Sequence, residues 1–170
     1  NISNALAALA TARALGVPTD TIVNAFKNLE RVPGRLDAVS PDKGPQVFVD
    51  YAHTDDALER VLETLRELTR GRLIVVFGCG GNRDRTKRPI MGAIAARLAD
   101  YSILTSDNPR TEVPARIIDE IHAGFGDVKA VEVVEDRRAA IQKALGMAST
   151  GDVVLVAGKG HENFQEFENR

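Results

Sequence analysis

Short runs of consecutive apolar residues recur along most of the chain, and amphipathic segments separate them. Most runs are continuous and rich in β-branched residues, which is typical of strands buried on both faces of a sheet. The alternation predicts an α/β fold of the doubly wound class, a mostly parallel sheet with helices on both faces. The predicted strands are 46–50, 72–77, 101–105, 130–134 and 152–157, and the predicted helices are about 55–69, 88–98, 114–124 and 137–147.

The beginning of the chain has a purely helical pattern. Residues 4–15 are rich in Ala and Leu, which are strong helix formers, and Gly16 stops the helix. Residues 19–29 predict a second helix, with Thr19 or Asp20 as its cap. This pair has an apolar side and little of its own to bury it against.

The change of pattern predicts two parts. We interpret residues 1–35 as the end of a preceding domain, with Val32-Pro33-Gly34-Arg35 as a hinge. Residues 36–170 then form the α/β domain. A chain of 170 residues is long enough for one well-packed domain and too short for two of ordinary size.

Composition excludes several classes of partner. The formal net charge of -2 gives no overall attraction to nucleic acid or to an anionic membrane, so we expect neither. The single cysteine, Cys79, forms no internal disulfide and fits a reducing compartment such as the cytoplasm. No apolar run approaches the roughly 18 residues of a membrane helix, and no signal peptide is visible.

Polar loops follow four of the predicted strands. The carboxyl ends of parallel strands meet at one edge of a sheet, where doubly wound folds bind their ligands. We therefore predict a ligand site at this edge. The four loops are Tyr51–Thr54, Gly78–Asp84, Ser106–Glu112 and Gly158–Glu162.

The turn Asp107-Asn108-Pro109-Arg110 is the most specific of these sequences. Pro109 fixes its own φ and biases Asn108 toward extended geometry, which holds Arg110 at a set angle. A guanidinium suits a carboxylate, and Asp107 can accept a hydrogen bond from an ammonium group, so the turn suits a zwitterionic amino acid. From these residues alone, an ordinary Asn-Pro turn with a solvated arginine is an equally good interpretation.

Two nucleotide-binding motifs are absent. The loop Gly78–Asp84 resembles a dinucleotide fingerprint, but Arg83 stands where the third glycine belongs, which argues against a nicotinamide oxidoreductase. Its glycines indicate either a tight turn with positive φ angles or close approach of backbone N–H groups to an anion. No G-x-x-x-x-G-K-[ST] occurs, so the chain has no P-loop of its own.

The remaining candidate residues favour simpler roles. His53 suits a nucleotide contact or an ordinary hydrogen-bonding role, and His122 is expected to be structural. Cys79 has no base partner nearby in sequence, so it is not a nucleophile, and no residue is assigned as catalytic. Arg137 and Arg138 are expected to form a solvated helix start. No cluster has metal-ligand spacing, so no metal ligand is assigned.

Five motifs in register resemble the Mur ligase family, and most closely its diaminopimelate-adding type. They cover nearly the whole chain from residue 30 onward, and the resemblance implies the Rossmann-like C-terminal domain of these enzymes. The motifs are Val32–Arg35, Asp50–Thr54, Gly78–Asp84 with Lys87-Arg88-Pro89, Asp107–Glu112, and Ala157–Glu162.

The resemblance implies a function for the whole enzyme. Such a ligase uses ATP and Mg²⁺ to activate the γ-carboxylate of UDP-N-acetylmuramoyl-L-alanyl-D-glutamate, and the amine of meso-diaminopimelate attacks the acyl phosphate. The third domain, which this chain resembles, packs on the N-terminal and central domains and presents the amino acid. The central domain holds most of the ATP and Mg²⁺ contacts, so this chain alone is expected to be inactive. The family usually continues with a further strand and helix after Gln165.

The resemblance also implies roles for individual residues. Arg110 pairs with the distal carboxylate that lysine lacks. Asp55 stands where the family commonly has proline, but both residues are favourable at a helix start. The residues expected to bind meso-diaminopimelate are Arg83, Asp107, Asn108, Pro109, Arg110, Gly158 and Glu162. The residues expected to meet ATP are Arg35, Asp50 and His53.

Alternatives remain open. The chain could belong to a lysine-adding sister ligase or a folylpolyglutamate-type ligase, although the turn 107–110 argues against both. It could also be a stand-alone amino-acid or nucleotide-binding module without catalysis. A reading frame that begins near residue 1 favours the module, and an upstream region with a P-loop favours the ligase.

Overall fold

The computed structural model describes residues 2–28, 32–39 and 44–168. The chain forms two compact units, residues 1–32 and 33–170. This division falls inside the tetrapeptide that we interpreted as a hinge.

The first unit is a pair of helices, α1 (Ile2–Ala14) and α2 (Thr19–Lys27). Gly16, with a φ of 81°, follows α1. The prediction that Thr19 or Asp20 caps α2 was wrong. Pro18 occupies the N-cap position in extended geometry, which places both polar residues inside the first turn, and no side chain caps the helix. Among the described residues of the whole chain, no helix has the length and apolar character needed to cross a membrane.

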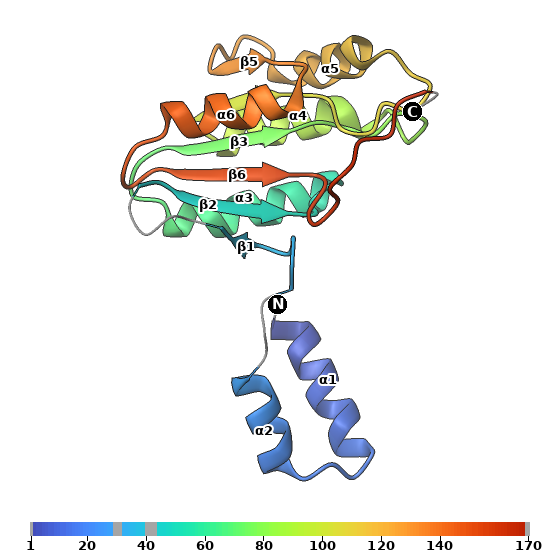
Figure 1. Cartoon of the computed structure of the whole chain (residues 1–170), viewed down its shortest axis with the longest axis vertical. Helices are drawn as coiled ribbons and strands as arrows, with labels where there is room; N and C mark the ends of the chain where they lie inside the picture. The colour runs from blue at the N-terminus through green and yellow to red at the C-terminus, as the bar shows by residue number, and fades with distance from the viewer. Residues whose placement is uncertain (1, 29–31, 40–43, 169–170) are drawn as a thin grey trace. The chain divides into compact units, whose positions relative to one another are not determined.

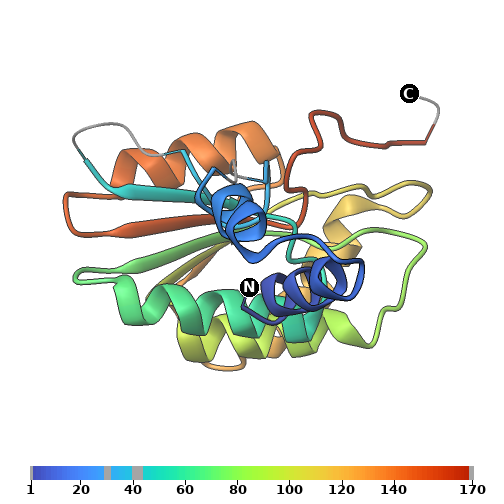
Figure 2. The same ribbon diagram turned by 90° about the horizontal axis from the view of Figure 1, so that it is seen from below.

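The second unit is a six-stranded sheet between two layers of helices (Figures 1 and 2). The strand order is β1-β2-β6-β3-β4-β5, and all neighbours are parallel except β1 and β2. The strands are β1 (Asp37–Ala38), β2 (Gln46–Asp50), β3 (Leu73–Phe77), β4 (Tyr101–Leu104), β5 (Val131–Val133) and β6 (Val153–Ala157). The helices are α3 (Asp55–Leu68), α4 (Lys87–Leu98), α5 (Pro114–His122), the 3₁₀ turn η1 (Ala123–Phe125) and α6 (Arg137–Met147).

This architecture confirms the predicted fold class, and the predicted strands and helices of this unit agree with the structure to within two residues. β1 was not predicted, because two residues carry no periodicity. The start of α3 at Asp55 is as expected, and Thr54 caps it by accepting a hydrogen bond from the N–H of Ala57 at 3.3 Å.

Alternate residues of the central strands face different helices. Leu73, Val75 and Phe77 pack with α3, α4 and α5, whereas Ile74 and Val76 pack with α6. Figure 2 shows these layers from below, with α6 on one side of the sheet and α3 and α4 on the other. Every residue of β3 and β6 is buried, which explains why these runs are continuous rather than alternating.

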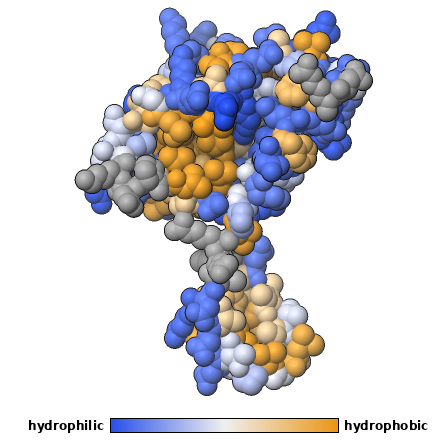
Figure 3. Space-filling view, viewed as in Figure 1, coloured by the Kyte–Doolittle hydropathy of each residue, from blue (hydrophilic) through white to orange (hydrophobic). Residues whose placement is uncertain are grey.

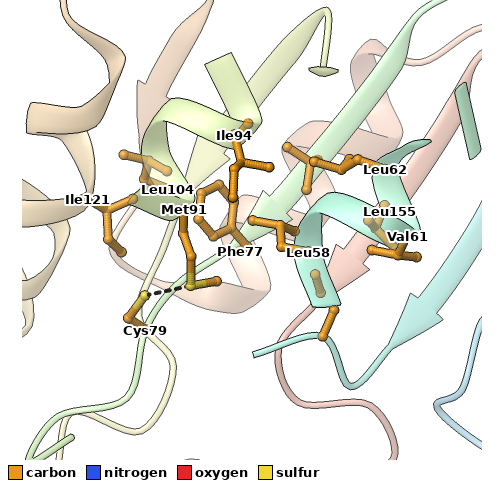
Figure 4. Packing of buried hydrophobic residues seen from close by; sticks show 14 of the residues in the cluster. Leu58, Val61, Leu62, Phe77, Cys79, Met91, Ile94, Leu104, Ile121 and Leu155 are labelled. Carbon is orange, nitrogen blue, oxygen red and sulfur yellow. Dashed lines mark hydrogen bonds between the residues drawn. The ribbon is translucent and has the colours of Figure 1, made fainter. Parts of the chain in front are cut away.

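Cys79 belongs to the larger core. It is 4% exposed, and its Sγ lies 3.6 Å from Sδ of Met91 (Figure 4). Burial raises the pKa of this thiol to about 12. The thiol therefore stays protonated at neutral pH, as expected for a residue with no nucleophilic role.

The direction of winding reverses between β3 and β6. From β3 the chain moves outward to β4 and β5, while β6 returns to lie between β2 and β3. In doubly wound folds such a switch point opens a crevice beyond the carboxyl ends of the two strands. The loops that begin at Gly78 and Gly158 leave from this point.

Candidate functional site

A cavity of about 460 Å³ lies at the carboxyl edge of the sheet, lined by loops that follow β2, β3, β4 and β6. It brings together most of the residues predicted from sequence. Pro109, Arg35 and Asp50 do not line it. Those that do are His53, Arg83, Asp107, Asn108, Arg110, Gly158 and Glu162.

The Arg110 guanidinium faces this cavity from a strained turn. Arg110 has a φ of 53°, a left-handed conformation that non-glycine residues rarely adopt. Its Nε pairs with Oε2 of Glu166 at 2.9 Å, and its Nη1 donates to the carbonyl of Gly81 at 2.9 Å. Within the described residues its Nη2 has no partner, so the guanidinium is oriented but keeps donors for a ligand carboxylate.

Glu162 provides negative charge in the same cavity. Its Oε2 accepts hydrogen bonds from Nζ of the buried Lys159 at 2.9 Å and from Nδ2 of Asn108 at 3.3 Å. Its Oε1 accepts from the hydroxyl of Tyr51 at 3.2 Å. The hydrogen bond from Lys159 lowers the pKa of Glu162, and the bond to Glu162 raises the pKa of Tyr51. Glu162 is therefore ionised at neutral pH and suits an ammonium group.

Asp107, the first residue of the turn, lies next to Gly158 at the end of β6. Its Oδ1 accepts from the N–H of Asn108 at 2.8 Å, and its buried Oδ2 has no hydrogen-bond partner within the described residues. Gly158 has a φ of 109°, and a Cβ built on it would lie 2.8 Å from this Oδ2. Glycine is therefore required at position 158 for the close approach of Asp107.

The expectation that Arg137 is solvated was wrong, although Arg138 is exposed. Arg137 is 7% exposed, and its Nη2 donates to the carbonyl of Ala157 at 2.8 Å. The first residue of α6 points back under the sheet edge, where burial lowers the pKa of Arg137 and the charge of Asp107 opposes that shift. Arg137 therefore supports the end of β6, and its charge interacts with that of Asp107.

The glycines after β3 do not serve a turn with positive φ angles, so that interpretation was wrong. Gly78, Gly80 and Gly81 are absent from the residues with positive φ, which in this loop include Asn82 at 55°. Instead, a Cβ on Gly78 would lie 2.0 Å from the carbonyl oxygen of Thr105, and one on Gly81 would lie 1.9 Å from that of Pro109. The glycines allow the loop after β3 to pack directly against the loop after β4.

The residues expected to meet ATP lie at the β2 end of the edge. Both carboxylate oxygens of Asp50 accept hydrogen bonds from backbone N–H groups, at 2.6 and 2.8 Å, so this side chain organises the local backbone. The exposed Arg35 lies over the Tyr51 ring, 4.7 Å from its centroid. His53 Nδ1 lies 2.8 Å from the carbonyl oxygen of Tyr51, so Nδ1 carries a proton and donates it.

Other features of the chain offer little for ligand chemistry. His122 is exposed, with its ring 6.1 Å from that of Phe125. Among the described residues, no group of three His, Cys, Asp or Glu side chains could hold a metal ion.

A second cavity, of about 540 Å³, lies on the α6 side of the sheet. Its apolar lining residues are Val49, Ile141, Val156 and Phe164, and Figure 3 shows apolar surface over β2 and β6 in this region. Its polar lining residues are Arg137, Arg138, Gln142, Lys159, Glu162, Asn163 and Gln165. The cavity at the carboxyl edge brings together more of the residues predicted from sequence, so it is the stronger candidate.

Sequence reasoning missed several residues of the site. Lys159 lies within the predicted loop Gly158–Glu162 but was given no role of its own, although it is buried and contacts Glu162. Gln165 and Glu166 gave no signal, because they follow the last predicted strand. In the structure Nε2 of Gln165 donates to the carbonyl of Asp107 at 2.7 Å, and the N–H of Glu166 donates to Oδ1 of Asn108 at 2.8 Å.

Comparisons with known proteins agree with this picture. A family model described as Mur ligase, glutamate ligase domain, matches residues 34–160. A relative from Thermosynechococcus vestitus, named UDP-N-acetylmuramoyl-L-alanyl-D-glutamate--2,6-diaminopimelate ligase, is 53% identical over 97% of this chain and 34% of its own length. A relative of the same name from Coxiella burnetii has the same identity and coverage.

Solved structures show the same relationship. A structure of UDP-N-acetylmuramoyl-L-alanyl-D-glutamate--2,6-diaminopimelate ligase matches with a TM-score of 0.75 and 43% sequence identity. The match covers 100% of this chain and 35% of the other chain. Escherichia coli FolC in complex with ADP, at 24% identity and a TM-score of 0.73 over 91% of this chain and 36% of its own, shares the fold.

This chain spans about a third of the length of the relatives it matches. The family model nevertheless covers most of the chain, including three of the four loops that form the cavity and the first part of the fourth. The resemblance of its motifs is thereby confirmed, and the chain belongs to the Mur ligase family.

Proposed function

We propose that this chain is the amino-acid-binding domain of an ATP-dependent ligase that adds meso-diaminopimelate to UDP-N-acetylmuramoyl-L-alanyl-D-glutamate in peptidoglycan synthesis. Relatives at about 50% identity carry the name of that enzyme. The observation that carries the proposal is the charge arrangement of one cavity, where Arg83 and Arg110 share the lining with Asp107 and Glu162.

This arrangement suits the chemistry of meso-diaminopimelate, which has a carboxylate and an ammonium group at each end. Arg110 pairs with the distal carboxylate, and Arg83, which has no hydrogen-bond or ion-pair partner within the described residues, contributes a second cation. Asp107 and Glu162 accept hydrogen bonds from the ammonium groups. Asn108, Pro109 and Gly158 shape the turn and the close approach around them.

The domain's contribution to the reaction is positioning. Holding the reacting amine near the activated carboxylate converts an encounter between two molecules into a step within one complex, which contributes several kcal/mol in general. His53, Arg35 and Asp50 meet ATP from the β2 end of the edge. The main phosphate contacts and the magnesium ligands belong to the central domain, and the reaction takes place in the cytoplasm, where ATP and the nucleotide precursor are available.

The test is an assay of the full-length ligase that carries this chain. Phosphate release is measured with ATP, the UDP-linked dipeptide and either meso-diaminopimelate or L-lysine. We expect turnover with meso-diaminopimelate and a kcat/KM with lysine that is lower by about 100-fold or more, because lysine lacks the carboxylate that Arg110 grips. Equal use of lysine, or binding of the amino acid without turnover, would contradict the proposal. The 170-residue chain alone should release no phosphate.

A further inference from the structure

Arg88 is a completely buried arginine that does not line the cavity. Its Nη1 and Nη2 donate to the two carboxylate oxygens of Glu112, each at 2.9 Å. Nη1 also donates to Oε2 of Glu120 at 2.8 Å, and Nη2 donates to the carbonyl of Gly80 at 3.3 Å. One side chain on α4 thereby joins the loop after β3, the loop after β4 and helix α5.

Glu112 extends this connection to the backbone of both loops. Its Oε1 accepts a hydrogen bond from the N–H of Asn82 at 2.5 Å, and its own N–H donates to the carbonyl of Pro109 at 3.0 Å. Asn82 immediately precedes Arg83, and Pro109 immediately precedes Arg110. Arg83 and Arg110 each therefore follow directly after a residue whose backbone Glu112 holds.

Asn82, which Glu112 contacts, and Arg110, which follows Pro109, are backbone positions that need outside support. Asn82 has a φ of 55° and Arg110 a φ of 53°, left-handed conformations that persist only where the surroundings hold them. Two parallel N–H···O bonds give a bidentate pair a defined orientation as well as energy. Lysine has no planar fork and cannot reproduce this geometry.

We propose that Arg88 is a positioning residue of the amino-acid site. Its bidentate pair with Glu112 sets the separation and orientation of the two loops that present Arg83 and Arg110. This inference rests on the proposed function, and it adds a residue that never touches the substrate. A displacement of about 1 Å at such loops is enough to weaken productive binding strongly.

A purely structural role is the alternative, and the same sheet offers a matched control. At its opposite edge, Arg72 pairs with the buried Asp152 through Nε at 3.2 Å and Nη2 at 2.8 Å. Both donors meet the same oxygen, Oδ2, so Arg72→Lys removes a guanidinium that donates twice to a carboxylate at the sheet edge opposite the cavity. A purely structural role at both positions predicts that each substitution lowers the Tm and that neither raises the KM for meso-diaminopimelate selectively.

The experiment compares Arg88→Lys with Arg72→Lys in the full-length ligase. We expect Arg88→Lys to raise the KM for meso-diaminopimelate by about tenfold or more, with the KM values for ATP and for the UDP-linked dipeptide within about twofold of wild type. Arg72→Lys should lower the Tm and leave all three KM values unchanged. Unchanged KM for meso-diaminopimelate in Arg88→Lys, or equal KM changes in both variants, overturns the proposal.

Two further measurements keep the proposal testable. If Arg88→Lys does not fold, Glu112→Gln, which preserves side-chain shape, should raise the same KM in the same direction. Amide hydrogen exchange of Asn82 and Arg110 should be faster in Arg88→Lys than in Arg72→Lys, and equal rates overturn the proposal. Hydrogen exchange needs no turnover, so equal exchange rates would reveal a failure of this inference alone. A failure of the proposed function would appear separately, as a wild-type enzyme that does not use meso-diaminopimelate.

Discussion

Both edges of the central sheet carry arginines and carboxylates, but the two edges use them differently. At the amino edge the carboxylates are satisfied by the protein itself. Asp152 accepts hydrogen bonds from the N–H, Nε and Nη2 of Arg72 and from the N–H of Ser149. Asp100 accepts from the N–H of Leu73 at 2.7 Å and pairs with Arg66 at 2.5 Å.

At the carboxyl edge, several charged groups keep unused hydrogen-bonding capacity. Within the described residues Arg83 has no partner, and Asp107 has one carboxylate oxygen without a hydrogen bond. Arg110 is held by only part of its guanidinium. Charges that stabilise a fold are paired internally, whereas charges that await a ligand are oriented and left incomplete. The following substitutions test that difference.

The largest expected effect is that of Arg110→Asn. Asparagine tolerates a positive φ, so the substitution removes the guanidinium with little change of backbone. The kcat/KM for meso-diaminopimelate should fall by about 100-fold, equivalent to roughly 2.7 kcal/mol, because hydrogen bonds to a charged group are lost. The free energy of unfolding should change by less than about 1 kcal/mol.

Arg70→Asn is the matched control, because Arg70 is exposed and lies in the loop before β3, at the amino edge. Arg70→Asn should alter neither the kcat/KM for meso-diaminopimelate nor the free energy of unfolding. Similar losses of kcat/KM in both variants would show that Arg110 has no special role. Steady-state kinetics of the full-length enzyme provide the measurement.

For Asp152→Asn we expect the opposite of the Arg110→Asn result, a loss of stability without a change in the KM for meso-diaminopimelate. The amide would retain one acceptor but present an NH₂ group to donors that now meet a carboxylate, and the free energy of unfolding should fall by about 2 kcal/mol. The side chain of Asp152 is 8% exposed, so water cannot replace the lost contacts. Urea denaturation measures the loss, and a changed KM for meso-diaminopimelate would break the distinction between the two edges.

Glu112 links stability to pH at the carboxyl edge. The hydrogen bonds from Arg88, and then that from the N–H of Asn82, lower the pKa of Glu112 from its ordinary 4.5 to about 2. A carboxylate with a lowered folded pKa stabilises the protein above its unfolded pKa, and this contribution is lost as the pH falls from 4.5 to about 2. Glu112→Gln should therefore lower the free energy of unfolding by about 1–2 kcal/mol at pH 7, and the difference from wild type should shrink below pH 4.5. A difference that is independent of pH in urea titrations would refute the ion pair.

The smallest effect is expected for Gly80→Ala. A Cβ at this position would lie 3.1 Å from Nη1 of Arg110, which is the far end of a flexible side chain. The guanidinium can shift by a few tenths of an ångström, so we expect about a threefold rise in KM for meso-diaminopimelate and a change in unfolding free energy below about 0.5 kcal/mol. An unaltered KM would indicate that the position of Arg110 is less constrained than the contacts suggest.

Much of this fold was predictable because its central strands are buried on both faces. Runs such as 73–77 and 153–157 leave few alternatives, and parallel pairing then requires that their following loops meet. The position of the turn 107–110 at this edge could be predicted for the same reason. These predictions depend on local pattern and on topology, both of which the sequence expresses directly.

Other features depend on contacts between distant segments. Arg137 stands among polar residues at a helix start and looks solvated, yet α6 directs it toward the carbonyl of Ala157. The role of Gly81 is set by the carbonyl of Pro109, 28 residues away along the chain, not by its own turn. No local pattern encodes the position of a partner that arrives only on folding.

The segment after β6 connects the turn 107–110 to the last described residues of the chain. The backbone of Glu166 exchanges hydrogen bonds with the turn, and Phe167 forms a parallel bridge with Arg110. On the proposed function, an amino acid that displaces the turn should also displace these residues. A fluorescent label at Phe167 would consequently act as an optical reporter of occupancy, read without any catalytic turnover.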